Sequence, residues 1–326
     1  MAPSSFSLSG ASISEEPPVS PYLPLIIGII AAASSSILIR FAQREAPSLI
    51  IAAYRLSLAT LFLLPPILHN RKSVFQALTG RLTRLILLSG AFLSLHFAAW
   101  ITSLEFTSVA SSVVLVQTAP ILVALLSPFF LQEKLRRSTW LGIGIAFAGS
   151  LLVSTSDLCH VQSWHLLCPP VATLLAGTAL KGDLLAIAGA AAVTGYILIG
   201  RKIRDQVPLL PYLFLTYGTA AILLVAMAFV AGQDFTGYTP MTYLWLVLLA
   251  LFPQLIAHSS VNWALRYLPA AIVSVFLLGE PVGSTILAVF ILDEIPPPLR
   301  LFGGVLILAG ILVTAISPRR RSGLSR

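Results

Sequence analysis

The chain has 326 residues, of which 57% are hydrophobic and 10% are charged, and it carries a formal net charge of +8. A water-soluble domain does not need so much apolar surface, so the composition excludes a soluble globular protein and indicates an integral membrane protein. The apolar runs are continuous, which excludes a membrane barrel, whose strands alternate apolar and polar residues.

Ten apolar stretches predict ten transmembrane helices. A bilayer core about 30 Å thick is crossed by roughly 20 apolar residues, and the short loops between segments of that size hold nearly all the charges. The predicted helices are 22–41, 48–68, 83–103, 108–131, 138–156, 183–200, 210–231, 242–264, 270–292 and 298–317. Residues 1–21, rich in Ser and Pro, and the basic segment 318–326 are expected to be cytoplasmic tails, the first of them disordered.

The first five helices match the last five at a constant offset of 161 residues. The match rests on Pro, Gly and charged residues, and the pairs are Gly28 with Gly189, Arg40 with Arg201, Pro47 with Pro208, Pro120 with Pro281, Glu133 with Glu294, Gly142 with Gly303, and Gly149 with Gly310. Because each half has an odd number of spans, the second half must cross the membrane in the opposite sense. The sequence therefore predicts an all-α integral membrane protein of two inverted five-helix repeats, 22–156 and 183–317, as in secondary transporters.

The basic residues predict the orientation. With the amino terminus inside, 15 of the 20 Lys and Arg residues lie on the inner side, four lie on the outer side, and Arg55 lies within a span. By the positive-inside rule both termini are cytoplasmic, in a multi-pass protein of the cell (inner) membrane. The positive charge therefore reports orientation in the lipid bilayer, and no nucleic acid partner is expected.

The longest interior connection, residues 157–182, is predicted to be an extracytoplasmic linker between the repeats. It contains both cysteines of the chain, Cys159 and Cys168. In a bacterium this loop faces an oxidising compartment, which favours a disulfide between them over two free thiols. A zinc site is less favoured, because the Cys and His residues lack the close paired spacing of structural zinc sites.

Two tracts carry a family resemblance. The first is "APSLIIAAYRLSLATLFLLP", with Pro47 and Arg55; the second is "VVLVQTAPILVALLSPFFLQEKLRRSTWLGIGIAFAG", with its counterpart "VSVFLLGEPVGSTILAVFILDEIPPPLRLFGGVLILAG". Over residues 22–317 the chain resembles the ten-helix EamA-type members of the drug/metabolite transporter superfamily. The resemblance implies transport of amino acids, metabolites or toxic organic compounds, with efflux as the implied direction, and it does not name a substrate.

Glu280 and Arg55 are ionisable residues inside predicted helices. An ionised side chain near mid-bilayer costs at least about 2.5 to 3.5 kcal/mol, so each is expected to face protein, water or a substrate. Loss of hydration near the midplane favours the neutral form of Glu280 and makes it a candidate proton carrier; the alternative is a structural ion pair with Arg55. For Arg55 a structural role ranks ahead of binding a substrate carboxylate.

Pro120 and Pro281 lie near the middles of equivalent helices. Each removes a backbone hydrogen bond and is expected to kink its helix. In a bilayer the freed carbonyl needs a partner, so the kinks are expected to line a polar cavity shared by Gln117 and Glu280. Kinks that serve packing alone are the alternative.

A weaker correspondence pairs His96 and Trp100 with His258 and Trp263, at offsets of 162 and 163. A histidine can relay a proton to Glu280 near neutral pH, but an intramembrane histidine more often only hydrogen-bonds a neighbouring helix. The remaining candidates are Asn262, close to His258 on the eighth span, and Tyr196, which with Trp100 and Trp263 would supply aromatic walls for an organic substrate.

Two further repeated features are expected to be structural. Gly142 with Gly149, and Gly303 with Gly310, are seven residues apart, so each pair lies on one helix face and allows close helix packing. Glu133, like its counterpart at 294, ends a span just before a new helix begins, where a carboxylate can accept from amides at the positive helix end. A hinge or gate role is the less favoured alternative for both.

No enzymatic chemistry is predicted. The spans contain no HExxH motif and no pair of central Asp residues, and the chain has no phosphate-binding glycine loop, so neither hydrolytic chemistry nor ATP hydrolysis is expected. No cofactor or metal is expected, and a single interior Arg disfavours phosphorylated cargo. The sequence predicts a secondary active transporter of a small amphipathic or zwitterionic organic solute, with proton coupling through Glu280 favoured over uniport or solute exchange. It does not indicate an oligomeric state.

Overall fold

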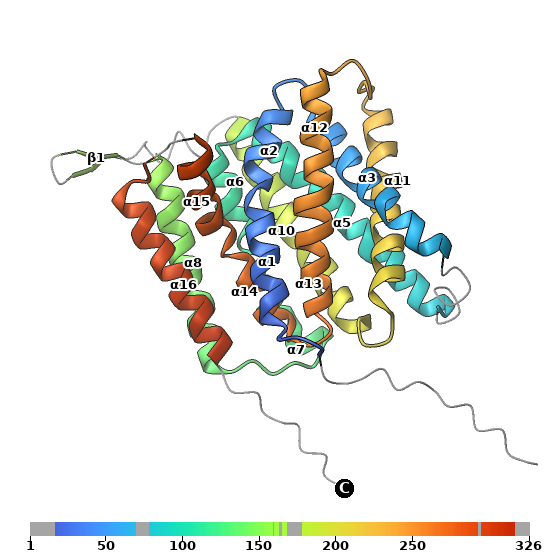
Figure 1. Cartoon of the computed structure of the whole chain (residues 1–326). Coiled ribbons are helices and arrows are strands. Elements are labelled where there is room, and N and C mark those ends of the chain that lie inside the picture. The colour runs from blue at the N-terminus through green and yellow to red at the C-terminus, as the bar shows by residue number, and fades with distance from the viewer. Residues whose placement is uncertain are drawn as a thin grey trace, which may run out of the picture.

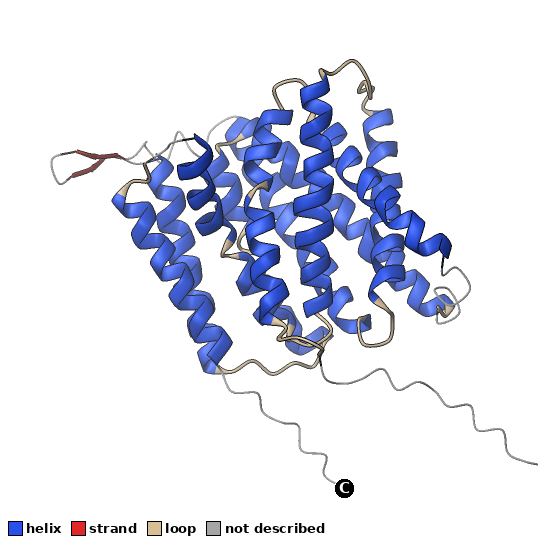
Figure 2. Cartoon of the chain, in the orientation of Figure 1, coloured by secondary structure: helices blue, strands red, loops and turns tan. Residues whose placement is uncertain are grey.

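The computed structural model describes residues 17–69, 78–158, 160–162, 165–167, 178–292 and 295–316, which form a helical bundle (Figures 1 and 2). The first half contains α1 (Tyr22–Ala33), α2 (Ser35–Ala42), α3 (Ser48–His69), α5 (Gly80–Phe106), α6 (Val109–Val116), α7 (Ala119–Phe130) and α8 (Arg137–Leu158). The second half contains α10 (Thr178–Ile203), α11 (Leu209–Val230), α12 (Pro240–Leu249), the π-helix η1 (Ala250–His258), α13 (Ser259–Ala264), α14 (Ala270–Leu277), α15 (Glu280–Leu292) and α16 (Pro298–Ile316).

These elements combine into ten segments, within the described residues, that are long and apolar enough to cross a membrane. Their outer surfaces carry large apolar side chains, and Phe129, Phe229 and Phe290 are 77% to 81% exposed. Such rings would be unfavourable in water, whereas a bilayer accepts them. The fold is therefore that of an all-α, multi-pass membrane protein.

The connection between the halves is shorter than the sequence indicated. Helix α10 begins at Thr178, and the strands β1 (His160–Gln162) and β2 (His165–Leu167) pair as an antiparallel hairpin. The helix begins earlier because its polar residues have partners: the Asp183 carboxylate accepts from the hydroxyls of Thr107 and Ser111, at 2.8 Å each. Cys159 and Cys168 lie outside the described residues, so their disulfide stays a prediction.

Contacts between the halves follow an inverted two-fold arrangement. Spans that hold the same place in both halves pack together: α3 on α11, α8 on α16, and the fourth span on the ninth through α7 and α14. Helix α5 packs on α10, and the inverse contact is made by α1 and α2 on α12, η1 and α13. A two-fold axis in the membrane plane produces this exchange, so the chain is built from two inverted five-helix repeats.

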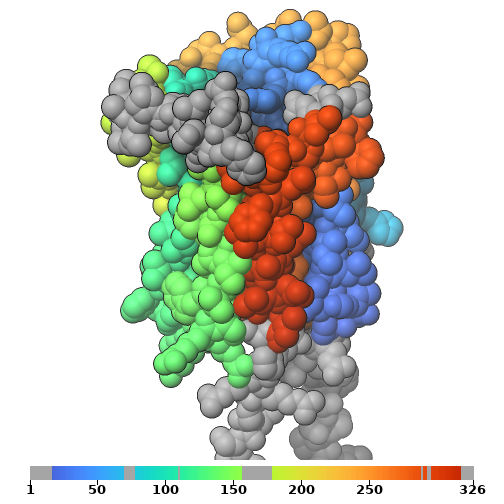
Figure 3. All heavy atoms as spheres, turned by 90° about the vertical axis from the view of Figure 1, so that its left-hand side faces the viewer, coloured from blue at the N-terminus to red at the C-terminus, as the bar shows by residue number. Residues whose placement is uncertain are grey.

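The α8–α16 contact, whose two helices lie side by side on the face in Figure 3, depends on the paired glycines. A Cβ atom on Gly149 would lie 2.6 Å from the carbonyl oxygen of Gly303, and one on Gly310 would lie 2.5 Å from that of Gly142. The atoms that such a Cβ would meet belong to the backbone of the facing helix, so they cannot move without moving that helix. Close backbone approach therefore fixes the place where the two repeats join.

The described chain begins and ends on one face of the bundle, which we call the termini face (Figure 1). There the Tyr22 hydroxyl at the start of α1 donates to the Ala315 carbonyl near the end of α16, at 3.3 Å. On the opposite face, Glu45 accepts from the Thr239 amide and the Thr242 hydroxyl, at 2.9 and 2.8 Å. These hydrogen bonds, the Thr239 amide first, hold the pKa of Glu45 below its ordinary value.

Candidate substrate cavity

Two helices at the centre of the bundle are interrupted at equivalent positions. The fourth span breaks between α6 and α7, and the ninth span breaks between α14 and α15, in both cases across two residues. Each second half-helix has a proline in its first turn, Pro120 in α7 and Pro281 in α15. Proline suits that place because the first helical N–H groups have no intrahelical partner. The prolines thus restart each helix after a break.

A cavity of about 100 Å³ lies beside these breaks, between the two repeats. It is lined by eight of the residues that the sequence singled out, namely Arg55, His96, Trp100, Gln117, Pro120, Tyr196, His258 and Glu280. Lining from both repeats is the arrangement in which movement of one repeat against the other would change access to the cavity.

Arg55 of α3 is completely buried and points inward. Its Nε donates to Oε1 of Gln254 at 2.9 Å, its Nη1 donates to the Ser35 hydroxyl at 3.1 Å, and its Cζ lies 4.2 Å from the centre of the Phe97 ring. These contacts hold the guanidinium plane but use only part of its donors. The remaining donors have no partner among the described residues, so they are available to a bound acceptor.

Glu280 is the first residue of α15 and lies in the wall of the cavity. No ion pair joins it to Arg55, although the structure describes both residues, and its carboxyl group has no hydrogen-bond partner among the described residues. The structural ion pair that the sequence left open is therefore not formed. Both ionisable groups of the cavity remain available for other partners.

Aromatic and imidazole rings form the next part of the wall. His96 Nδ1 lies 2.9 Å from the Gly189 carbonyl oxygen; because that oxygen only accepts, Nδ1 must carry the proton, and Nε2 of the neutral ring is left as an acceptor. The His96 ring stacks on Trp100 with centroids 5.7 Å apart. Trp100 Nε1 and His258 Nδ1 are buried and have no partner in the described structure. These atoms add unused hydrogen-bonding capacity to the cavity.

Other sequence-predicted residues lie behind the wall or away from it. The Asn262 amide is buried and donates to the Tyr196 hydroxyl and to the His258 carbonyl, so it supports two residues of the wall. Trp263 does not line the cavity and packs on Tyr267, with ring centres 4.7 Å apart. Pro281 is buried but does not line the cavity either.

The matching of His96 with His258 differs from the structural equivalence by one residue. A Cβ on Gly189 would meet His96 and Trp100, and a Cβ on the equivalent Gly28 would meet Ala257 and Ser260. His96 is thus the counterpart of Ala257. The two histidines reach the same cavity without being related by the repeat.

The sequence interpretation missed Ser35, Pro253 and Ser274, which also line the cavity. Pro253 lies within the π-helix η1, where the wider turn removes the clash between a proline ring and the preceding turn. Its position inside a predicted span was a visible signal. Ser35 and Ser274 gave no such signal, because serine is common in membrane helices. Among the described residues, no group of His, Cys, Asp and Glu could hold a metal ion.

A central cavity between inverted repeats with interrupted helices defines a membrane transporter. The sequence profile of the EamA-like transporter family matches residues 20–155 and 180–316, so the chain belongs to that family.

Proteins similar to this chain occur in a bacterium and in an archaeon. The chain is 24% identical over 306 residues to the uncharacterized transporter YetK of Bacillus subtilis, covering 92% of this chain and 88% of YetK. It is 23% identical over 297 residues to an uncharacterized transporter of Archaeoglobus fulgidus, covering 90% and 96% of the two chains. A solved structure described as "Crystal structure of protein" superposes with a TM-score of 0.72 at 18% identity, over 90% of this chain and 95% of that one. This last likeness concerns the fold alone.

Proposed function

We propose that the chain is a secondary active transporter that exports a small amphipathic or zwitterionic organic solute, coupled to protons through Glu280. One observation carries the proposal: the cavity between the repeats contains a buried cation, Arg55, and a carboxyl group, Glu280, that do not pair with each other. Unpaired ionisable groups are costly inside a membrane protein. They are retained where a solute or a proton provides the missing partner.

The chemistry of the lining favours a zwitterion. The free donors of Arg55 and the unpartnered Nε1 of Trp100 suit a carboxylate, while Glu280 suits an ammonium group. Apolar residues such as Val193, Ile197 and Leu277 supply the rest of the wall. Phosphorylated solutes carry more charge than one Arg, without a Lys in the described lining, would neutralise.

Glu280 supports the coupling because its carboxyl group is free to exchange partners. A proton and a substrate ammonium would compete for it, so that binding of one favours release of the other. Export from the cytoplasm with both chain ends on the cytoplasmic side follows from the family resemblance and from the distribution of Lys and Arg. Uniport or solute exchange is the second candidate mechanism, and it requires no titration of Glu280.

The test is transport by the purified protein in liposomes that contain a pH-sensitive dye. A panel of amino acids and small organic amines is added with and without a pH gradient, and proton flux and solute uptake are recorded. For the wild type we expect solute-dependent proton flux with at least one member of the panel. In Glu280→Gln, which cannot titrate, proton flux should fall to background while exchange of labelled solute persists.

Glu105→Gln is the matched control, because Glu105 accepts the Ser48 amide outside the cavity and glutamine keeps that acceptor. It should transport like the wild type. Undiminished proton-driven uptake in Glu280→Gln contradicts the coupling role. Solute flux that ignores the pH gradient in the wild type supports uniport or exchange instead.

A further inference from the structure

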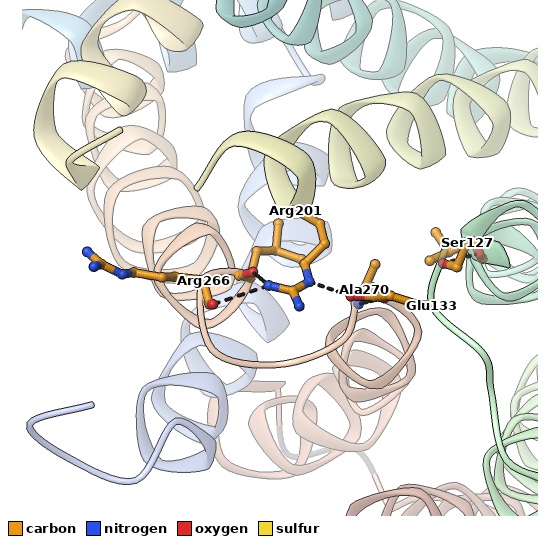
Figure 4. Close-up of polar contacts among 7 residues, drawn as sticks. Ser127, Glu133, Arg201, Arg266 and Ala270 are labelled. Atoms are coloured by element: carbon orange, nitrogen blue, oxygen red, sulfur yellow. Dashed lines mark hydrogen bonds and ion pairs between the residues drawn. The ribbon is translucent and has the colours of Figure 1, made fainter. Parts of the chain in front are cut away.

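An ion pair ties four elements together on the termini face. Nε of Arg201 lies 2.6 Å from Oε1 of Glu133, and Nη1 of Arg201 donates to the carbonyls of Leu265 and Arg266 at 3.0 and 3.2 Å (Figure 4). The second oxygen of Glu133 accepts the amide of Ala270, the first residue of α14, at 3.1 Å. We call these five residues the termini-face link. It joins the chain after α7 to the ends of α10 and α13 and the start of α14.

The link lies between the cavity and the termini face. Three of its positions are one helical turn from a lining residue, and these pairs are Ile197 and Arg201, Val261 and Leu265, and Ser274 and Ala270. Four residues along a helix are about 6 Å, and residues so spaced share a face. The same helix faces that enclose the cavity are thus fastened together one turn further toward the termini face.

The link is the only ion pair between two described side chains, and it joins the two repeats. The side chains of Arg201 and Glu133 are only 25% and 16% exposed, so solvent screens their attraction less than at an open surface. Gln132, just before Glu133, has a left-handed backbone with a φ of 57°. This conformation, unfavourable for a residue with a side chain, turns the chain after α7 and leads into Glu133.

Among the described residues, the opposite face has no ion pair between the repeats; there the carboxylates of Glu45 and Asp183 accept hydrogen bonds from neutral groups of the other repeat. Arg40, the counterpart of Arg201, is exposed and has no hydrogen bond or ion pair with another described residue. Glu105, the counterpart of Arg266, accepts the amide of Ser48 within its own repeat. The two ends of the cavity are therefore held unequally in this structure.

We propose that Glu133 and Arg201 form the gate that closes the cavity toward the termini face. Resting on the transport function proposed above, the inference is that this pair separates each time a solute passes between the cavity and that face. The link resists separation through several charge-assisted hydrogen bonds, yet each partner can be hydrated once it moves outward. Breaking the pair shifts the protein toward the conformation that is open on the termini face.

The experiment measures access to the cavity and requires no substrate. Cys159 and Cys168 are replaced by Ser, and Ser274→Cys is introduced as a reporter. In the described part of the chain, the Ser274 hydroxyl bonds only the Ala271 carbonyl of its own helix. Vesicles of both orientations, identified by an amino-terminal tag, are treated with a charged methanethiosulfonate. In the parent the reporter should react slowly from the termini face.

Arg201→Gln should raise the labelling rate from the termini face by about tenfold, the population shift expected from loss of a charge-assisted hydrogen bond. Glu133→Gln should act in the same direction. Lys202→Gln is the matched control, since Lys202 is an exposed neighbour on α10 outside the link, and its rate should equal that of the parent.

Thermal unfolding checks that both link variants are folded. If the labelling rate of both folded variants equals that of the parent, the gate is overturned and the ion pair only holds the helix ends together. If Ser274→Cys itself fails to fold, Val193→Cys serves as the reporter at another point of the wall. The labelling rate does not depend on Glu280, so failure of proton coupling and failure of the gate are separate outcomes.

Discussion

The two repeats place different residues at equivalent points around the cavity. Counterparts 161 residues apart pair a polar or charged side chain with one that lacks its charge or its amide: Arg55 with Thr216, Glu280 with Ala119, Gln117 with Leu278, and Gln254 with Leu93. At the joint between the repeats the same offset pairs Gly142 with Gly303 and Gly149 with Gly310, and these glycines pack on each other. We call counterparts with the same residue equal positions and those with different residues unequal positions. The equal positions hold the bundle together, and the unequal positions give the cavity its polar and ionisable groups.

The sharpest way to break this comparison is to alter an equal position. Gly149→Ala puts a Cβ 2.6 Å from the Gly303 carbonyl and forces α8 away from α16. We expect a loss of about 3 kcal/mol or more in unfolding free energy, the upper end of the range for overpacking, because the new methyl group meets backbone atoms that cannot turn aside. Thermal unfolding in detergent measures it.

Gly144→Ala is the matched control, made on the same helix where a Cβ would meet nothing within 4 Å. It should be neutral or stabilising by up to about 1 kcal/mol, because alanine favours helix. Equal stability of the two variants would contradict the close contact between the repeats.

A smaller effect is expected from making an unequal position equal. Gln254→Met gives the second repeat an apolar residue where the first has Leu93, and it leaves Nε of Arg55 without its acceptor. The loss should be about 1.5 to 3 kcal/mol, the worth of a hydrogen bond to a charged group. The unfolding temperature of the purified protein checks this.

Gln254→Glu keeps the acceptor oxygen and replaces the amide nitrogen, which has no partner in the described structure. This control should be at least as stable as the wild type, since the new charge faces the guanidinium. Destabilisation by both variants to the same extent would mean that shape, and not the acceptor, matters at this position.

Length and apolar composition were sufficient to predict the ten spans, because a bilayer demands a fixed length of apolar helix. The repeat was visible in Gly, Pro and charged residues, whose roles in packing and helix breaking do not allow easy replacement. Arg55 and Glu280 could be found for the same reason: ionisable groups are rare inside spans. The EamA-like family match and the helices of the structure confirm the fold class.

Other parts of the cavity depend on contacts that a linear pattern does not contain. The bond from Arg55 to Gln254 joins residues 199 positions apart and needs the π-helix η1 between α12 and α13. Asn262 was selected for its polarity, but its orientation behind Tyr196 follows from packing. Trp263 was selected by matching it to Trp100 at an offset of 163 instead of 161, and its side chain lies outside the cavity.

The weakest predicted effect concerns loops at the two faces. Glu45 accepts from Thr239 and Thr242 across the repeats, while the side chain of its counterpart Gln206, among the described residues, donates only to the Lys202 carbonyl and the Asp205 carboxylate of its own repeat. The pKa of Glu45 is lower in the folded protein than its ordinary value of 4.5. The contact therefore stabilises the fold above about pH 4.5 and is lost as the pH falls through the lower folded pKa.

Glu45→Gln should reduce the unfolding temperature slightly at pH 7. The difference from the wild type should shrink as the pH falls through the lowered pKa of Glu45, because the wild-type side chain then also becomes neutral. Asp205→Asn is the control, because Asp205 is exposed and its carboxylate accepts, among the described residues, only from the neighbouring Gln206 side chain. This variant should differ little from the wild type at either pH. A Glu45→Gln difference that persists unchanged at low pH would assign the effect to side-chain shape. A difference that vanishes at low pH would show that the charge of Glu45 stabilises the fold. This contact, which the counterpart Gln206 does not make, then adds to the symmetric packing of the two repeats.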